Sequence, residues 1–142
     1  MTREDKELLL KALCARLPYG VKVESVFINP DTKEHKSCGI EVFDATSILM
    51  IRDGLGEFKP YLFPLSSMTE EQWRELFETA GYEVREVDCG RHTEMFYYDM
   101  VGHENTLYPN CDAIDWLNSH HFDYRGLIPM GIAIDATGLN IY

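Results

Sequence analysis

The stretch KPYLFPLSSMTEEQWRELFETAG, residues 59–81, contains the clearest folding signals in the chain. Its first part carries Pro60 and Pro64, and proline fixes its own φ and favours extended backbone at the residue before it. Thr69 and Gln72 then form the T-x-x-Q pattern of a capping box. The stretch therefore predicts an extended segment followed by a helix that begins directly after Thr69.

The predicted helix is amphipathic. Its apolar residues recur at helical spacing, with charged residues on the other face, and the apolar set is Trp73, Leu76, Phe77 and Ala80. Met68, just before the cap, can pack against Trp73 as a hydrophobic staple. Gly81 ends the helix, because glycine adopts the left-handed conformation that closes many helices. We expect the apolar face to point into a core.

Two further helices are predicted near the ends of the chain. The first begins after Thr2 and ends at Pro18, and its apolar face carries Leu9, Leu13 and Leu17. The other begins at a cap formed by Asn110 or Asp112 and ends near His120, with an inward face of Ala113, Ile114 and Leu117. Each has an apolar face that needs a sheet or another helix to cover it.

The remaining apolar runs predict strands. Residues 21–28 are dense in β-formers, and residues 38–43 and 46–52 look like the two strands of a hairpin. Residues 82–88 alternate apolar and charged side chains, which predicts a half-buried strand with residues 95–101 as its partner. These strands favour an antiparallel sheet against which the predicted helices pack.

Length and composition favour one domain. The chain has 142 residues, of which 45% are hydrophobic and 12% aromatic, and this is ample for a core. No repeat, linker or low-complexity tract interrupts it. We therefore expect an α+β fold, a single compact domain over residues 1–142, with an antiparallel sheet and about three helices.

The charge of the chain excludes some classes of partner. Thirteen basic and 24 acidic residues give a net charge of −11, and the charges are interspersed. A chain without a basic stripe is not expected to bind nucleic acid or an anionic membrane through phosphate contacts. The sequence shows no run of membrane-spanning length and no signal peptide at its polar start. We expect a cytoplasmic protein with reduced thiols at Cys14, Cys38, Cys89 and Cys111.

Three blocks carry a resemblance to a known family. They are ALCARLPYGVKV, KPYLFPLSSMTEE and DWLNSHHFDYRGLIPMGIAID, at residues 12–23, 59–71 and 115–135. The blocks resemble a family of small uncharacterised proteins of gut bacteria and of their prophages or mobile elements. Since they lie at the start, middle and end, the resemblance covers the frame of the chain. It implies an intracellular accessory protein of the kind that phages and mobile elements carry, and it implies no chemistry.

The first polar motif has the spacing of a metal site. His35-x-x-Cys38 and Cys89-x-x-His92 would together supply the four ligands of a Cys2His2 zinc site. The alternative is a surface histidine, a small buried thiol and a turn, because free cysteine is among the most buried residue types. We favour the alternative, and we expect no metal and no other cofactor.

The second polar cluster consists of His120, His121, Asp123 and Arg125. These residues are the candidates for acid–base or metal-dependent catalysis. Adjacent histidines at a helix end point about 100° apart, so they seldom chelate one ion together. One of them is better placed at the C-terminus of the third helix, where an imidazole interacts well with the helix dipole.

Arg125 is the only lysine or arginine after Arg91, in a segment with many carboxylates. A guanidinium in so acidic a setting is expected to form a bidentate pair with a carboxylate. Asp115 and Asp123 are its nearest candidates in sequence. Such a pair would tie the C-terminal segment to the third helix, and binding of an anion in a site is the alternative.

Aromatic residues are numerous, and aromatic residues are enriched at protein interfaces. The leading interpretation is therefore a non-catalytic protein-interaction module, an accessory protein with a protein partner or a homodimer. One alternative is an enzyme or metal-dependent activity centred on the His120–Arg125 cluster. Another is an acidic decoy that occupies a DNA-binding enzyme, although its mixed charge pattern counts against this.

Overall fold

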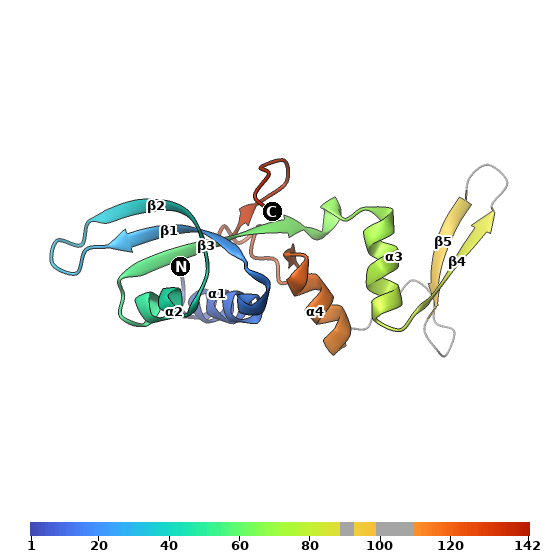
Figure 1. Ribbon diagram of the computed structural model, residues 1–142, viewed down its shortest axis with the longest axis horizontal. Helices are drawn as coiled ribbons and strands as arrows, with labels where there is room; N and C mark the ends of the chain where they lie inside the picture. Colours follow the sequence, from blue (N-terminus) through green and yellow to red (C-terminus); the bar gives the residue numbers. More distant parts are fainter. Residues whose placement is uncertain (89–92, 99–109) are drawn as a thin grey trace. The chain divides into compact units, whose positions relative to one another are not determined.

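The computed structural model describes residues 1–88, 93–98 and 110–142 (Figure 1). They form two compact units: unit 1 comprises Met1–Leu65 and His121–Tyr142, and unit 2 comprises Ser66–His120. Helices and sheets are both present, which confirms the predicted α+β fold. Cooperative folding of residues 1–142 as a single domain stays a prediction.

Unit 1 is built on a five-stranded sheet with the order β2-β1-β3-β6 and with β7 also paired to β3. The strands are β1 (Lys22–Ile28), β2 (His35–Val42), β3 (Gly56–Pro64), β6 (Phe122–Asp123) and β7 (Ile134–Asp135). β1 is antiparallel to both β2 and β3. The two short C-terminal strands, however, run parallel to β3.

The expected antiparallel sheet is therefore wrong in part, because this sheet is mixed. Parallel neighbours need a long crossover connection between them. The segment Ser66–His120, which forms unit 2, lies in sequence between β3 and β6 and supplies that connection. The segment predicted as a simple extended lead-in is β3, which pairs with β1, β6 and β7.

Proline is tolerated within β3 because of the ladder geometry. The Phe43 amide donates to the Val21 carbonyl oxygen at 2.9 Å. Along an antiparallel ladder, every second residue of a strand bonds to the same neighbouring strand. Since Val21 bonds to Phe43, Val23, two positions further on, also directs its backbone N–H and C=O toward β2. Pro60 lies opposite Val23. The missing amide hydrogen of Pro60 therefore removes no hydrogen bond between β1 and β3.

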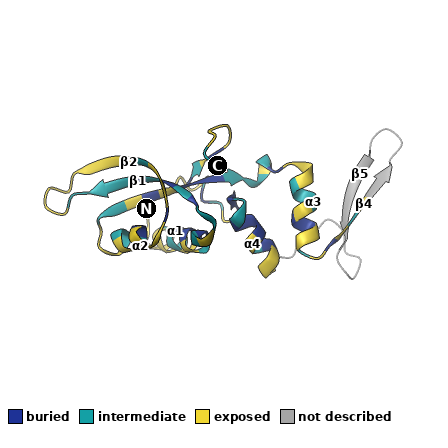
Figure 2. Cartoon of the chain, viewed as in Figure 1, coloured by how far each residue is buried: buried dark blue, intermediate teal, exposed yellow. Residues whose placement is uncertain are grey.

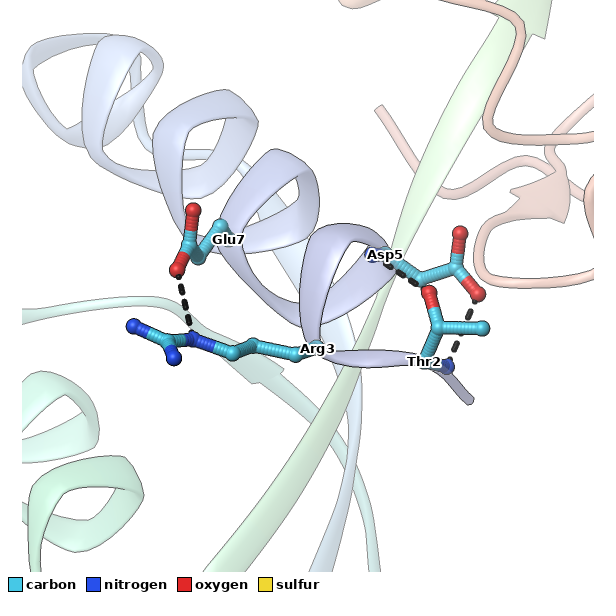
Figure 3. A network of polar contacts seen from close by, with 4 residues as sticks. All are labelled: Thr2, Arg3, Asp5 and Glu7. Atoms are coloured by element: carbon cyan, nitrogen blue, oxygen red, sulfur yellow. Dashed lines mark hydrogen bonds and ion pairs between the residues drawn. The ribbon is translucent and has the colours of Figure 1, made fainter.

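Helix α1 (Arg3–Ala15) begins as predicted, at a cap formed by Thr2 (Figure 3). The Asp5 amide donates to Thr2 Oγ1 at 3.1 Å, and the Thr2 amide donates to Asp5 Oδ2 at 3.0 Å. This reciprocal capping box satisfies two amides that a helix end would otherwise leave unpaired. A 3-10 turn (Leu17–Tyr19) follows α1, and Gly20 closes it at φ 65°.

Helix α2 (Ala45–Arg52) corrects the sequence analysis, which predicted residues 46–52 as a hairpin strand. Asp44 Oδ1 accepts the Ser47 amide at 2.9 Å, and Ser47 Oγ accepts the Asp44 amide at 3.2 Å. The β-branched residues of the segment favoured a strand, but this cap directs the backbone into a helix. Strand β2 consequently pairs with β1.

Both helices lie on one face of the sheet in unit 1 (Figure 1). Inward and outward side chains alternate along β1 and β3, as the period of a strand requires. The inward ones join α1 and α2 in a core of Leu9, Ala12, Leu13, Val21, Val23, Phe43, Phe58, Leu62, Leu127, Ile132 and Ala133, with Ile48, Met50 and Ile51 packed against it.

Unit 2 contains the helix predicted after Thr69, α3 (Glu70–Thr79). The Gln72 amide donates to Thr69 Oγ1 at 3.2 Å, and the Thr69 amide donates to Gln72 Oε1 at 2.9 Å, which confirms the capping box. Leu76 and Phe77 are buried, whereas Trp73 is only half-buried. A 3-10 turn (Leu65–Ser67) precedes this helix.

The other elements of unit 2 also follow the prediction. β4 (Glu83–Asp88) pairs antiparallel with β5 (Thr93–Tyr98), and residues 99–101 of the predicted partner strand lie outside the described residues. Helix α4 (Cys111–Ser119) is capped by Asn110, whose Oδ1 accepts the Ala113 amide at 2.8 Å. Helices α3 and α4 are neighbours in this unit. The described residues contain four α-helices, one more than expected, and the additional helix is α2.

Candidate functional site

Asp123 is buried within the cluster that was predicted as a possible catalytic centre. Its Oδ1 accepts the Leu127 amide at 2.9 Å, and its Oδ2 accepts the Ile128 amide at 2.8 Å. Both carboxylate oxygens therefore hold the turn that follows β6. A carboxylate bonded in this way fixes the backbone between β6 and β7.

Arg16, which the sequence analysis did not single out, is fully buried at the C-terminal end of α1. Its Nη1 donates to the Ala12 carbonyl oxygen at 3.0 Å, and its Nη2 donates to the Phe122 carbonyl oxygen at 2.7 Å. Its guanidinium carbon also lies 5.3 Å from the centre of the Tyr124 ring. Arg16 therefore joins α1 to the C-terminal segment.

The electrostatic setting of Arg16 is unusual for a cation. Burial lowers the pKa of Arg16, because desolvation disfavours the charged form, while Tyr124 and Asp123 act in the opposite direction. Its position at the negative end of the α1 dipole favours the charge. The sequence signal for such a residue is weak, because an arginine at the end of an amphipathic helix is usually solvated.

Arg125 does not make the predicted pair with Asp123, whose carboxylate bonds to backbone amides. Asp115 belongs to unit 2, and the pair with Asp115 stays a prediction. Arg125 is exposed, and its guanidinium lies 5.1 Å from the centre of the Tyr124 ring. Among the described residues of unit 1 no ion pair of Arg125 is found, and the arginine that anchors the C-terminal segment is Arg16, which joins it to α1 rather than to the third helix.

His121 is buried and has a φ of 60°, in the left-handed region that is uncommon for residues with a side chain. It directly follows the C-cap of α4, where glycine is the usual residue. Its ring stacks on that of Tyr142, with centroids 3.8 Å apart and planes 11° apart. His121 therefore helps to seat the C-terminal residues on unit 1.

Tyr142 is 44% exposed, yet its hydroxyl makes two hydrogen bonds. The hydroxyl accepts the Lys22 amide at 3.0 Å and donates to the Tyr61 carbonyl oxygen at 2.8 Å. Burial raises the pKa of Tyr142 to about 12. The Tyr61 hydroxyl nearby donates to Glu24 Oε2 at 2.7 Å, which raises the pKa of Tyr61 as well.

The raised pKa of Tyr142 predicts a loss of stability at high pH. The folded protein holds this proton more tightly than the unfolded chain, so the stabilisation is complete below pH 10 and is lost as the pH approaches 12. Urea unfolding between pH 9 and 12 should therefore show a steeper decline for the wild type than for Tyr142→Phe. The Tyr61 contribution remains in both proteins, and equal slopes would show that Tyr142 is not responsible.

His120 occupies the position predicted for one of the two histidines, the C-cap of α4. Its ring stacks on Trp116 at 3.9 Å, and its Nδ1 lies 2.9 Å from the Trp116 carbonyl oxygen. Ser119 Oγ also donates to that oxygen and lies 3.0 Å from His120 Nδ1. In the tautomer whose Nδ1–H donates to the carbonyl, this nitrogen is not available as a base for Ser119.

The predicted zinc ligands are only partly within the described residues. His35 and Cys38 lie on β2 and are both exposed, so the expectation of a buried thiol at Cys38 is wrong. Cys89 and His92 lie outside the described residues. In the part of the chain that is described, no three His, Cys, Asp or Glu residues are close enough together to hold a metal ion. Cys14, Cys38 and Cys111 are free thiols.

The most exposed strand of unit 1 is β2, at one end of the strand order. Seven of its eight residues are exposed, and Figure 2 shows this along most of the strand. Ile40 and Val42 are 51% and 53% exposed, which is unusual for two apolar neighbours on one strand face. They lie opposite Glu24 and Lys22, on the sheet face that α1 and α2 do not cover.

The backbone of β2 offers hydrogen bonds at its free edge. The Phe43 amide donates to the Val21 carbonyl oxygen, and the Asn29 amide donates to the Glu34 carbonyl oxygen at 2.9 Å. These bonds show which residues at each end of the β1–β2 ladder direct their backbone groups toward β1, and every second residue from them does the same. The groups that point away from β1 are therefore those of His35, Ser37, Ile40 and Val42. Among the described residues no strand pairs with them. We define these four residues as the free edge of β2.

Comparisons of the chain with protein-family models, with curated proteins and with solved structures find no match. None of the helices in the described ranges is both long and apolar enough to cross a membrane.

Proposed function

We propose that this protein is a non-catalytic protein-interaction module that binds an extended segment of a protein partner along the free edge of β2. The observation that carries the proposal is an edge strand with exposed apolar side chains and outward-facing backbone groups. A strand added to such an edge obtains affinity from main-chain hydrogen bonds and specificity from alternate side chains. The exposed Ile40 and Val42 would supply those side-chain contacts.

The rival catalytic interpretation has less support. Asp123 uses both carboxylate oxygens to hold backbone amides, and His120 and His121 each stack on an aromatic ring. Arg125 is exposed beside Tyr124. These contacts support structural roles for Asp123, His120 and His121, leave Arg125 at the surface, and favour the interaction module over an enzyme.

The edge also has features that proteins use to prevent pairing. Lys36 is a charged residue on the edge strand, and the register of the β1–β2 ladder shifts between Ser25 and Val26. If these features block the edge, the protein binds no extended peptide. Peptide selection on the wild type separates a blocked edge from an edge that binds an extended peptide.

Selection of displayed random peptides against the immobilised protein tests the module, and Ser37→Pro is the informative variant. The Ser37 amide points away from β1, so proline there removes an edge donor without breaking the β1–β2 ladder. Peptides selected on the wild type are expected to bind Ser37→Pro at least about tenfold more weakly. Ser37→Ala keeps the amide and should bind them as the wild type does.

Two results would contradict the proposal. One is a failure of the wild type, immobilised as a monomer, to select any peptide in repeated rounds. The other is equal binding of the selected peptides by wild type and Ser37→Pro, which would place the contact elsewhere on the surface. Circular dichroism and the melting temperature of both variants establish that the fold is retained.

A further inference from the structure

We propose that the free edge of β2 binds β2 of a second copy of this chain, in an antiparallel pair about a two-fold axis. This inference rests on the proposed function, because it names the partner of the same edge. It concerns only backbone groups and side chains of β2, which are described within unit 1.

The spacing of the edge-facing residues carries the argument. A regular strand directs every second residue toward one edge. In β2 the ladder with β1 shifts register, since Ser25 pairs with Gly39 and Val26 pairs with Ser37, and this leaves Cys38 as an extra residue. The edge-facing positions 35, 37, 40 and 42 consequently lie two, three and two positions apart along the chain.

This spacing is the same when it is counted in either direction. A regular peptide can match the edge on only one side of the bulge, because it has no extra residue. A second copy that runs antiparallel carries the same extra residue, Cys38. In the proposed pair the two bulges lie next to each other at the two-fold axis. Its Ile40 would then lie opposite Ser37, and its Val42 opposite His35, so that edge-facing groups meet on both sides of the bulge.

The charges of β2 agree with this register. Lys36 and Glu41 lie between edge-facing positions and are both exposed. In the proposed pair Lys36 lies opposite Glu41 of the second copy, and the symmetry repeats the contact. Such non-hydrogen-bonded partners have Cα atoms only about 4.5 Å apart, so their side chains interact. Ser25 Oγ donates to Glu41 Oε2 at 2.8 Å and holds that carboxylate in place.

Other registers are disfavoured by the same charges. A two-fold axis at Lys36 would place two lysines opposite each other, and an axis at Glu41 would do the same with two glutamates. Like charges directly opposite on neighbouring strands are destabilising. The register centred between Cys38 and Gly39 is the one that combines matched edge groups with opposite charges.

Sedimentation equilibrium of the full chain in reducing buffer tests the dimer, with thiols reduced so that Cys38 cannot form a disulfide link. The wild type is expected to be a dimer that dissociates on dilution. Ser37→Pro should be monomeric over the same concentrations, and Ser37→Ala should remain dimeric. Lys36→Glu and Glu41→Lys, measured alone, should each raise the dissociation constant about tenfold or more, because each places two like-charged pairs in the interface.

Mixing these two charge variants is the decisive measurement. In a mixed dimer, the glutamate introduced into one chain would face the lysine introduced into the other. The unchanged Glu41 of the first chain would face the unchanged Lys36 of the second, so both contacts are again attractive. Native mass spectrometry of Lys36→Glu mixed with Glu41→Lys should show mainly the heterodimer.

The failures of the two proposals are distinguishable. A wild type that stays monomeric at all concentrations but binds selected peptides at β2 overturns the self-pairing and leaves the proposed function standing. A dimer that persists in Ser37→Pro, or a mixture with no preference for the heterodimer, also overturns the self-pairing. Failure of both peptide binding and dimerisation overturns both.

Discussion

Replacing Arg16 with alanine is expected to lower the free energy of unfolding by about 2–5 kcal/mol, the range for deleting a large buried side chain. Arg16 is fully buried, and it donates hydrogen bonds to the carbonyl oxygens of Ala12 and Phe122. Alanine leaves a void at the end of α1 and removes the link to β6. Thermal or urea unfolding measures the change.

Two matched variants separate the loss of hydrogen bonds from the loss of buried volume and from the removal of an arginine as such. Arg16→Met keeps most of the volume but removes the donors, so its cost should be smaller, about 1–3 kcal/mol for carbonyl groups that lose their hydrogen bond. Arg125→Ala removes an exposed arginine that also lies beside Tyr124, and it should stay within about 0.5 kcal/mol of the wild type. Equal losses for Arg16→Ala and Arg125→Ala would show that burial of Arg16 does not matter.

The same experiment tests the single-domain prediction. The two tryptophans, Trp73 and Trp116, both lie in unit 2, whereas Arg16 lies in unit 1. If residues 1–142 unfold cooperatively, tryptophan fluorescence and far-UV circular dichroism report the same lowered midpoint in Arg16→Ala. If the units unfold separately, the fluorescence midpoint stays at its wild-type value.

Phe77→Ala is expected to cost about 3–5 kcal/mol, as replacement of a buried aromatic residue does. Phe77 is 5% exposed on α3, and its ring meets that of Tyr82 edge to face, with centroids 5.1 Å apart. Trp73→Ala should cost less, although the residue is larger, because Trp73 is only half-buried. Thr69→Ala should cost about 1 kcal/mol, the usual cost of a lost N-cap.

Urea unfolding followed by circular dichroism gives this ranking without dependence on tryptophan. The sequence pattern placed Trp73 and Phe77 on one inward face, and the structure assigns the deeper position to Phe77. A larger loss for Trp73→Ala than for Phe77→Ala would contradict that assignment. An unchanged stability for Thr69→Ala would show that the capping box does not hold the start of α3.

Local signals in the sequence determined most of the secondary structure. The caps at Thr2 and Thr69 were predicted from the sequence, and the cap of α4 was limited to Asn110 or Asp112, because a cap is a hydrogen bond between residues three apart. The pairing of β4 with β5 was also predictable, because the two strands are neighbours in sequence. The segment that became α2 was predicted wrongly, since its β-branched residues outweighed the cap at Asp44.

Contacts between distant residues could be decided only by the tertiary structure. Residues 16 and 122 are 106 positions apart, and no local pattern shows that the Arg16 guanidinium reaches the Phe122 carbonyl. The parallel pairing of β6 and β7 with β3 depends on the long connection through unit 2. The free edge of β2 has the same origin. The sequence shows a β-rich run there, but only the register with β1 determines which backbone groups point outward, because hydrogen bonds to one neighbour fix what remains for another.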